Sequence, residues 1–327
     1  MMINLAVLGA TGLVGQKMRK ILRERNVPFD HIFFFASKNS AGKKLYFKDA
    51  WYNILELTKD NLKQCGITHA LSALDSPLAK EFLPYLAELG AIIVDNSSAF
   101  RMDDDVPLVV PEINLDAVEG NLIASPNCST IQSVVALKPI YDAFGIKRII
   151  YTTYQAVAGS GINGVEDLVR GDYNIANTFY PHPIAHNLLP HIDDFLDDGY
   201  TKEEMKMVNE TRKIFNDQEI AITATAVRVP VFESHMVSIV VETKEPFTMD
   251  QVLEAFQGAQ GVIVEDDVAH NVYPMPLNTA GKDEVFVGRI RRDHSVANGL
   301  NFICVADNTR KGAALNTIQI LEKFITK

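Results

Sequence analysis

Cysteine is scarce in this sequence, with three residues among 327, at positions 65, 128 and 304. An odd, sparse set without metal-ligand spacing excludes a disulfide scaffold and predicts no metal site. Long apolar runs are also lacking, and none approaches the ~20 residues that cross a bilayer. No basic stretch precedes the first apolar run. We therefore expect no signal peptide, no membrane partner and a cytoplasmic location.

Positive charge is in short supply as well. The chain has 31 Lys and Arg against 41 Asp and Glu, which gives a formal net charge of −10. Nucleic-acid-binding proteins normally carry a basic face, so we expect no nucleic-acid partner. An anionic substrate would need a few local cations, because the overall field repels it. The 47% hydrophobic composition allows two globular domains.

The first part of the chain alternates short apolar runs with helical patterns. The predicted strands there are residues 3–8, 31–36, 68–73, 91–95 and 106–110. After about residue 130 the predicted strands are longer and partly alternating, at residues 147–157, 220–229, 236–243, 284–292 and 300–307. We expect an α/β protein with a Rossmann-type doubly wound parallel sheet in residues 1–130, joined by a C-terminal helix at 312–327. Residues 131–311 should form an α+β domain with a largely antiparallel sheet.

Three glycines directly follow the first predicted strand. Gly9 permits a tight turn, Gly12 lets the backbone approach a pyrophosphate, and Gly15 allows close helix–strand packing. The phosphate would lie at the N-terminus of the next helix, where free N–H groups favour anions. The loop predicts a dinucleotide site, with a plain tight turn as the alternative. The other predicted cofactor contacts in this loop are Thr11, Leu13 and Val14.

The end of the second predicted strand bears on the choice of cofactor. An NAD site usually places Asp or Glu there to bind the ribose 2′-hydroxyl. The residues at this place are Ser37, Lys38, Asn39 and Ser40, with two further lysines close behind and no acid. Hydroxyls and cations suit a 2′-phosphate, so we favour NADP. A solvated loop would have the same residues.

Cys128 follows Asn127 and precedes a mostly apolar stretch at residues 131–144. This context places the thiol at or near a helix N-terminus, where the pKa of a thiol is lowered. Cys128 is therefore predicted to be a nucleophile, whereas Cys304 lies in an apolar strand and fits a buried hydrophobe. A thiol nucleophile with a nicotinamide cofactor indicates aldehyde chemistry through a thioester.

Over essentially its whole length the chain resembles the bacterial type of aspartate-semialdehyde dehydrogenase. The matching blocks are residues 9–15, 95–101, 110–114, 127–130, 154–157, 203–206, 228–235 and 306–314. The resemblance implies NADPH-dependent, reversible reductive dephosphorylation of L-aspartyl-4-phosphate to L-aspartate 4-semialdehyde, in lysine, threonine and methionine biosynthesis. It also implies an NADP-binding first domain, a catalytic and dimerisation second domain, and a homodimer or dimer of dimers.

The same resemblance gives roles to individual residues. It implies that Cys128 holds the thioester, that His235 is the general acid/base and that Gln155 orients the substrate. A bidentate guanidinium suits a planar carboxylate, so Arg228 corresponds to the arginine that grips the substrate α-carboxylate. Glu203 corresponds to the acid that holds the substrate ammonium. The implied phosphate ligands are Arg101, Lys206 and Asn127, and the further cofactor contacts are Ser72 and Asn308.

Three other functions compete with this reading of the residues. N-acetyl-γ-glutamyl-phosphate reductase shares the thiol and histidine chemistry, but its acetylated substrate has no ammonium for Glu203. A nucleotide-sensing protein without catalysis would have no need of Cys128. A cysteine hydrolase would not need the glycine loop. We therefore expect an aspartate-semialdehyde dehydrogenase that takes small-molecule substrates and inorganic phosphate.

Overall fold

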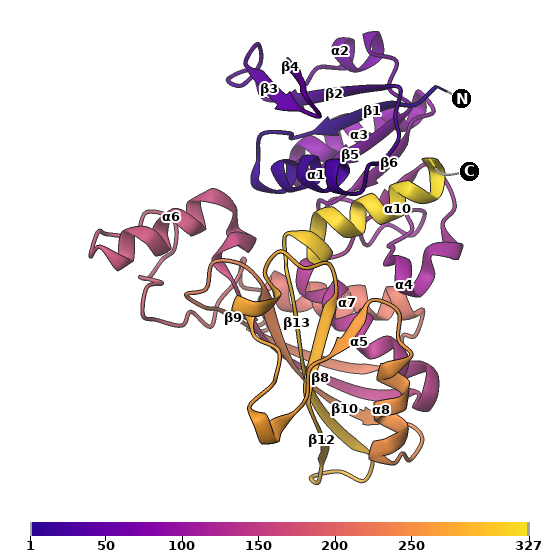
Figure 1. The fold of residues 1–327 in the computed structure, drawn as a ribbon, viewed down its shortest axis with the longest axis vertical. Coiled ribbons are helices and arrows are strands. Elements are labelled where there is room, and N and C mark those ends of the chain that lie inside the picture. Colours follow the sequence, from indigo (N-terminus) through magenta and orange to yellow (C-terminus); the bar gives the residue numbers. More distant parts are fainter. Residues whose placement is uncertain (1, 326–327) are drawn as a thin grey trace. The chain divides into compact units, whose positions relative to one another are not determined.

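The computed structural model describes residues 2–325, drawn in Figure 1. Two compact units share the chain: the first runs to Pro126 and resumes at Ala313, and the second spans Asn127–Gly312. The first boundary lies before the predicted residue 130, because Asn127 caps the helix that starts at Cys128 and this helix packs within the second unit. Residues 1, 326 and 327 of the predicted first domain lie outside the described residues.

The first unit contains a seven-stranded sheet in the order β3-β4-β2-β1-β5-β6-β7, parallel except for the β3–β4 pair. Its strands are β1 Asn4–Leu8, β2 His31–Ala36, β3 Lys44–Phe47, β4 Ala50–Glu56, β5 His69–Ser72, β6 Ile92–Asp95 and β7 Leu122–Ala124. The predicted parallel α/β sheet is thus confirmed.

One predicted strand of this sheet is wrong. Residues 106–110 form no strand, and the edge position belongs to β7 instead. The segment runs beside β7 and forms only an isolated bridge between Leu108 and Ala124. Pro107, which has no N–H to donate, accepts from Ala124 N at 2.9 Å but limits further pairing. The antiparallel addition of β3 and β4 was not predicted either.

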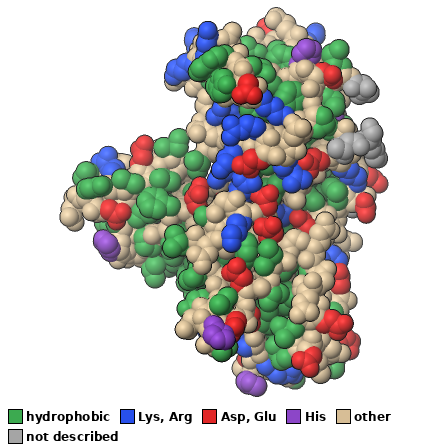
Figure 2. Space-filling view, viewed as in Figure 1, with side chains coloured by type: hydrophobic (Ala, Val, Ile, Leu, Met, Phe, Trp, Pro, Cys, Tyr) green, Lys and Arg blue, Asp and Glu red, His purple; other side chains and the backbone are tan. Residues whose placement is uncertain are grey.

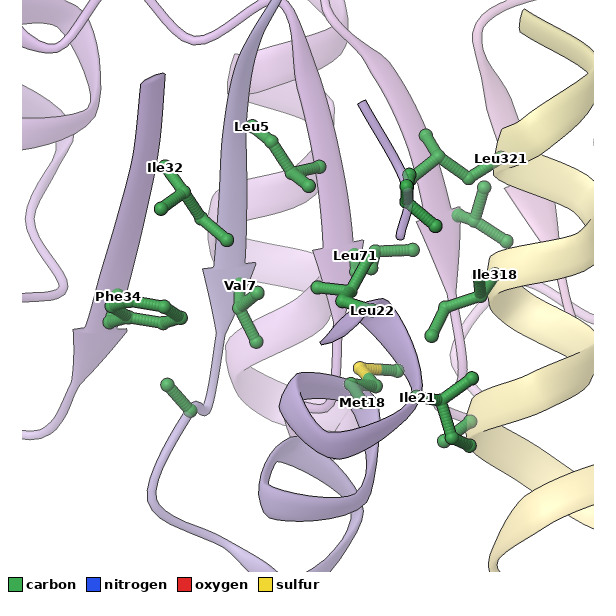
Figure 3. Packing of buried hydrophobic residues seen from close by; sticks show 14 of the residues in the cluster. Leu5, Val7, Met18, Ile21, Leu22, Ile32, Phe34, Leu71, Ile318 and Leu321 are labelled. Carbon is green, nitrogen blue, oxygen red and sulfur yellow. The ribbon is translucent and has the colours of Figure 1, made fainter. Parts of the chain in front are cut away.

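Helices cover both faces of this sheet. They are α1 Leu13–Glu24, α2 Lys59–Gln64, α3 Ser76–Glu88, α4 Pro111–Asn114 and α10 Leu315–Ile325, with a short 3-10 helix η1 at Leu115–Ala117. Successive residues of a strand point to opposite faces, so Leu5 and Val7 join the cluster under α1 and α10 (Figure 3), whereas Ala6 and Leu8 join the cluster under α3. The C-terminal helix therefore completes the core of the first unit.

The second unit contains a six-stranded sheet in the order β11-β12-β13-β10-β8-β9. Its strands are β8 Ile146–Gln155, β9 Ala221–Arg228, β10 His235–Thr243, β11 Val262–Val264, β12 Val285–Asp293 and β13 Gly299–Ala306. The pairs β8–β10, β10–β13 and β12–β13 are antiparallel, and β8–β9 and β11–β12 are parallel. The sheet is mixed: three of its five strand pairs are antiparallel, as predicted for most of the sheet, and its two edge strands run parallel to their neighbours.

The helices of the second unit are α5 Cys128–Phe144, α6 Gly161–Asp172, α7 Lys202–Phe215, α8 Met249–Gln257 and α9 Pro276–Thr279. The short helical segments are the 3-10 helices η2 Val157–Ser160 and η3 Val268–His270 and the π-helical η4 Arg310–Ala314, which passes the boundary into the first unit. Helix α5 packs on β8, β10, β12 and β13, and α7 packs on β9. Among residues 2–325, none of the helices is long and apolar enough to cross a membrane.

The topology of the mixed sheet brings three residues that are distant in sequence to the same end of three adjacent strands. The parallel strands β8 and β9 end at Gln155 and Arg228, which are partners in the ladder. The antiparallel strand β10 begins at His235, and its next residue pairs with the penultimate residue of β8. Gln155, Arg228 and His235 therefore lie close together at this end of the sheet.

Candidate active site

The glycine loop between β1 and α1 is built from close backbone contacts within the first unit. Gly9 has φ +76°, and a Cβ there would lie 2.6 Å from the carbonyl oxygen of Ala73. A Cβ on Gly15 would lie 2.2 Å from the carbonyl oxygen of Gly9. Both positions require glycine, one for a left-handed turn and the other for helix–loop packing.

Gly12 differs from its two neighbours in the motif. It caps α1 in an extended conformation, and a Cβ there would meet only the Gly9 carbonyl oxygen, at 3.6 Å. The first turn of α1 begins directly after it with Leu13 and Val14 and carries no acidic residue. Thr11 accepts a hydrogen bond from Gln16 Nε2 through its carbonyl at 2.9 Å. The loop therefore presents an open helix N-terminus suited to a phosphate.

The other predicted cofactor residues lie in different surroundings. Ser37, Lys38 and Asn39 are exposed after β2, in a turn closed by Ser40 N donating to Ser37 O at 2.9 Å. Ser72 ends β5, is fully buried, and is the ladder partner of Leu8. Asn308 belongs to the second unit, where its Oδ1 accepts from Ser234 N at 2.9 Å.

Arg101 is the one predicted substrate ligand in the first unit. It is buried, and its Nη2 donates to the carbonyl oxygen of Asn96 at 3.0 Å. The preceding turn is closed by Asp95, which accepts from Ser97 Oγ at 2.5 Å and from Ser97 N at 3.1 Å. Burial raises the pKa of Asp95, although Ser97 and the charge of Arg101 oppose the shift.

Cys128 is the first residue of α5, and Asn127 is its N-cap. Asn127 Oδ1 accepts from Ser129 N at 2.9 Å and from Thr130 N at 3.4 Å. Cys128 Sγ lies 3.2 Å from Nε2 of His235, although the two residues are 107 positions apart. The helix start predicted for this thiol is therefore present, with an imidazole in direct contact.

His235 is fully buried, and both its ring and its main-chain carbonyl accept hydrogen bonds. The backbone N–H of Ala156 donates to Nδ1 at 3.0 Å, and Gln132 Nε2 donates to the His235 carbonyl oxygen at 3.1 Å. Because Nδ1 accepts, the proton of the neutral ring lies on Nε2 and points at the Cys128 sulfur. Burial and then the charge of Arg228 lower the pKa of His235 well below 6.5, against the opposing charge of Asp307. The site thus favours a neutral imidazole that donates to sulfur.

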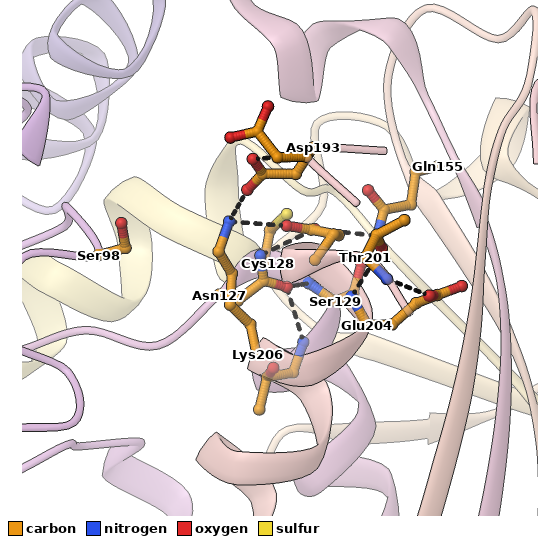
Figure 4. A network of polar contacts seen from close by, with 12 residues as sticks. Ser98, Asn127, Cys128, Ser129, Gln155, Asp193, Thr201, Glu204 and Lys206 are labelled. Carbon is orange, nitrogen blue, oxygen red and sulfur yellow. Dashed lines mark hydrogen bonds and ion pairs between the residues drawn. The ribbon is translucent and has the colours of Figure 1, made fainter. Parts of the chain in front are cut away.

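A polar network surrounds the start of α5 (Figure 4). Glu203 Oε1 accepts from Asn127 Nδ2 at 2.9 Å and from Gln155 Nε2 at 3.2 Å. Gln155 Nε2 also lies 2.6 Å from Ser129 Oγ, and Lys206 Nζ lies 3.1 Å from Glu203 Oε2. Burial alone would raise the pKa of Glu203, but Lys206 and Asn127 outweigh it and lower this pKa. Glu203 is therefore ionised, and it contacts three predicted site residues: Asn127, Gln155 and Lys206.

Arg228 lies beside the thiol–imidazole pair. It is buried, and its Nη1 donates to the Ala156 carbonyl oxygen at 2.8 Å. A Cβ on Gly159 would lie 3.0 Å from Arg228 Nη1 and 3.3 Å from His235 Nε2. Among the described residues, Arg228 Nε is buried without a hydrogen-bond partner. One residue, Ala156, thus orients both Arg228 and His235 through its backbone, and Gly159 keeps the space between them open.

The structure brings together Asn127, Cys128, Gln155, Glu203, Lys206, Arg228 and His235 in the second unit. Five residues around the site were not predicted from the sequence. Gln132 and Ala156 donate to His235, and Gly159 leaves space beside its ring. Asp193 accepts from Lys206 Nζ, and Glu210 accepts from Asn127 N. Only the short Ala-Gly-Ser run after β8 gave a local signal, as a small-residue segment at a strand end.

The remaining cysteines differ from Cys128. Cys304 is fully buried, and burial raises its pKa to about 12. Burial also raises the pKa of Cys65. The described residues hold no group of three or more His, Cys, Asp or Glu that could bind a metal ion.

Comparison with known proteins bears on this arrangement. The family model described as "Semialdehyde dehydrogenase, NAD binding domain" matches residues 4–121, and "Semialdehyde dehydrogenase, dimerisation domain" matches residues 137–311. The aspartate-semialdehyde dehydrogenase of Aquifex aeolicus is 49% identical over 333 residues, which cover 98% of each chain. The chain belongs to the aspartate-semialdehyde dehydrogenase family. The resemblance found in the sequence is thereby confirmed.

Solved structures of this family show the same architecture. Aspartate semialdehyde dehydrogenase II complexed with ASA from Vibrio cholerae is 42% identical, with a TM-score of 0.94 over 100% of this chain and 99% of that chain. The Candida albicans aspartate semialdehyde dehydrogenase with NADP is 26% identical, with a TM-score of 0.79 over 98% of each chain. The two-domain α/β fold is therefore a property of the family.

Proposed function

We propose that this protein catalyses the reversible reductive dephosphorylation of L-aspartyl-4-phosphate to L-aspartate 4-semialdehyde with NADPH. The observation that carries the proposal is the contact of Cys128 Sγ with His235 Nε2 at 3.2 Å, next to Arg228 and Glu203. A nucleophile, a carboxylate-binding cation and an ammonium-binding anion are what an amino-acid semialdehyde requires. The relatives named for this activity cover nearly the whole chain.

In the oxidative direction the Cys128 thiolate adds to the aldehyde carbon, and the carbonyl π electrons move to oxygen. The Nε2 proton of His235 then hydrogen-bonds the oxyanion of the hemithioacetal, and it can do so without a charged ring because Ala156 N–H holds Nδ1 as an acceptor. A nicotinamide cofactor, when bound, would accept the hydride from the hemithioacetal carbon, which would leave a thioester on Cys128. A phosphate oxygen attacks this thioester, the C–S bond breaks, and the thiolate returns; one proton is released overall.

Arg228 and Glu203 select the amino-acid end of the substrate. Arg228 has an uncommitted Nε and one Nη bonded to the Ala156 carbonyl, so its guanidinium is held while it grips the α-carboxylate. Glu203 remains ionised in a buried place and receives the ammonium. Gln155, fixed by Ser129 and Glu203, orients the substrate next to the thiol.

Lys206 and Asn127 bind phosphate within the second unit. Arg101 of the first unit is a proposed phosphate ligand on the family resemblance alone. The Asn127 amide is oriented by its contact with Glu203, and Lys206 keeps its charge because Glu203 and Asp193 raise its pKa despite burial. These local cations offset the repulsion that a protein of net charge −10 exerts on an anionic substrate.

The first unit binds NADP, and the second is the catalytic and dimerisation unit. The residues fit a dinucleotide, since Gly9 and Gly15 allow only glycine while the Gly12 end of α1 stays open. NADP supplies the hydride acceptor, and NADPH the donor in reverse. Ser37, Lys38, Asn39 and Ser40 would hold the 2′-phosphate, and Ser72 would lie along the cofactor. The family resemblance also implies that Asn308 is a cofactor contact.

The protein forms a homodimer or a dimer of dimers through the second unit. Apolar side chains gather over α6 and the loop after it (Figure 2). The exposed residues are Ile162, Val169, Tyr173, Ile175, Phe179, Leu188 and Phe195. A patch of this kind marks a protein contact. Cys65, Cys128 and Cys304 form no disulfide with one another, which accords with a reducing cytoplasm.

One assay tests the proposed function. Aspartate semialdehyde should support phosphate-dependent reduction of NADP, with NAD a poorer acceptor, and N-acetylglutamate semialdehyde should not react. Reaction with the acetylated substrate alone would assign the neighbouring reductase activity instead. Equal kcat/KM for NADP and NAD would contradict the assignment of the Ser37–Ser40 turn to a 2′-phosphate.

A further inference from the structure

Lys206 is held by two carboxylates at once. Its Nζ lies 2.6 Å from Asp193 Oδ2 and 3.1 Å from Glu203 Oε2 (Figure 4). One ammonium is therefore shared between two anions, and the shorter contact is to Asp193. A phosphate that approaches Lys206 meets a cation whose charge is already more than balanced.

The two carboxylates are not equally fixed. The Glu203 side chain is 8% exposed and also accepts from Asn127 and Gln155. The Asp193 side chain is 31% exposed, and it also accepts a local hydrogen bond from Asp194 N to Oδ1 at 2.9 Å. Because Glu203 is locked into the network, Asp193 is the anion that can leave Lys206 at lower cost.

Asp193 stays ionised in this place. Burial would raise its pKa, but the hydrogen bond and charge of Lys206 and the Asp194 N–H outweigh burial and lower it. The residue has φ +68°, in the left-handed region that Asp and Asn adopt more readily than other side chains. The loop before α7 thus aims a permanent negative charge at the lysine.

We propose that Asp193 is a positioning residue that acts as the internal counter-ion of Lys206 and sets the affinity for phosphate. In the free enzyme it holds the ammonium in place, and an incoming phosphate or acyl phosphate must displace it. The contact weakens phosphate binding and thereby speeds its release. This inference rests on the proposed role of Lys206 in binding phosphate.

The neighbouring residue offers a matched control. Asp194 Oδ2 lies 2.7 Å from Lys202 Nζ, a pair of similar length whose side chains are 74% and 53% exposed. Exposed pairs are screened by water and contribute little. Asp194→Asn removes the same charge one residue away without touching Lys206.

The test measures KM for phosphate and for aspartate semialdehyde in the oxidative direction. Asp193→Asn removes the charge but keeps a residue that tolerates positive φ, so it should lower the phosphate KM about three- to tenfold. The KM for aspartate semialdehyde should stay within about twofold, because Arg228 is held separately by Ala156. Asp194→Asn should leave the phosphate KM unchanged. A merely structural defect would not improve affinity for one substrate.

Two further variants make the result decisive. Asp193→Gly also removes the charge and accepts positive φ, so it replaces Asp193→Asn should that variant fail to fold. Lys206→Ala tests the proposed function itself and should raise the phosphate KM at least tenfold. If Lys206→Ala raises this KM but loss of the Asp193 charge leaves it unchanged or raises it, the counter-ion role is wrong and the phosphate site stands. If Lys206→Ala has no effect, both assignments fail.

Discussion

The two units make their functional surfaces in different ways. In the first unit the backbone does so: Gly9 and Gly15 have no room for a Cβ, and the end of α1 is left open at Gly12. In the second unit buried and partly buried side chains form the site, through contacts such as Cys128 with His235 and Glu203 with Gln155. A backbone site tolerates changes of side chain but not added volume, whereas a side-chain site fails on loss of a single donor or acceptor.

The largest expected effect comes from the nucleophile of the second unit. Cys128→Ser should lower turnover by about a thousandfold or more, because a hydroxyl is a weak nucleophile without a strong base and His235 Nε2 is already a donor. NADP binding, measured by cofactor fluorescence or calorimetry, should persist. Cys304→Ser is the control, since this buried thiol should affect packing and stability rather than turnover. Wild-type activity in Cys128→Ser would refute the mechanism.

Two arginines, one in each unit, sharpen the comparison. Lysine keeps the charge of Arg228 but loses the planar fork, so Arg228→Lys should weaken binding of aspartate semialdehyde by about 2–4 kcal/mol. Arg101→Lys should raise the phosphate KM by a comparable factor. Measuring both KM values in both variants separates the two roles. An unchanged phosphate KM in Arg101→Lys would remove Arg101 from the phosphate site.

The glycine loop gives the converse experiment in the first unit. The Cβ of Gly15→Ala would lie 2.2 Å from a backbone oxygen, so the variant should lose about 1–3 kcal/mol of unfolding free energy and bind NADP poorly. The matched control is Gly12→Ala, whose Cβ would meet that oxygen at 3.6 Å, so the variant should lose only the ~0.5 kcal/mol by which Ala is a poorer N-cap than Gly. Denaturant titration distinguishes them. Equal losses would show that the loop geometry is misassigned.

The same contrast explains what could be predicted from the sequence. The glycine loop is local, so three glycines between a strand and a helix were sufficient to predict its turn and the open end of α1. The pairing of Cys128 with His235 spans 107 positions and depends on the order of β8, β9 and β10, which no local pattern reveals. The helix-start context predicted Cys128, and the resemblance to a family supplied His235. It did not assign a role to Ala156, which acts through its backbone N–H on His235, or to Asp193, which forms an ion pair with Lys206.

The strand predicted at residues 106–110 is wrong for a related reason. Residues 106–110 are apolar enough for a strand, and four of the five are buried, yet Pro107 limits their pairing. The shorter run at Leu122–Ala124 takes the edge because its backbone pairs with β6. Apolar periodicity indicates burial, and hydrogen-bonding capacity decides which buried segment joins the sheet.

The smallest expected effect concerns the buried ring of the second unit. His235 remains neutral in the folded protein because burial and Arg228 lower its pKa well below 6.5, whereas the unfolded chain takes up a proton near pH 6.5. The unfolded state therefore binds more protons as the pH falls, so this residue costs stability below pH 6.5 and nothing above it. The expected loss is about 1 kcal/mol between pH 6.5 and 5.5, and its slope approaches about 1.4 kcal/mol per pH unit at lower pH. His235→Gln cannot titrate, so its unfolding free energy should fall less steeply than that of the wild type over this interval, measured by urea titration.

His270→Gln is the control, because His270 is exposed and paired with Asp267. Parallel slopes for His235→Gln and the wild type would mean that the folded ring takes up a proton as readily as the unfolded chain over this interval. The donor role of Nε2 toward the sulfur would then have to be reassigned to an imidazolium.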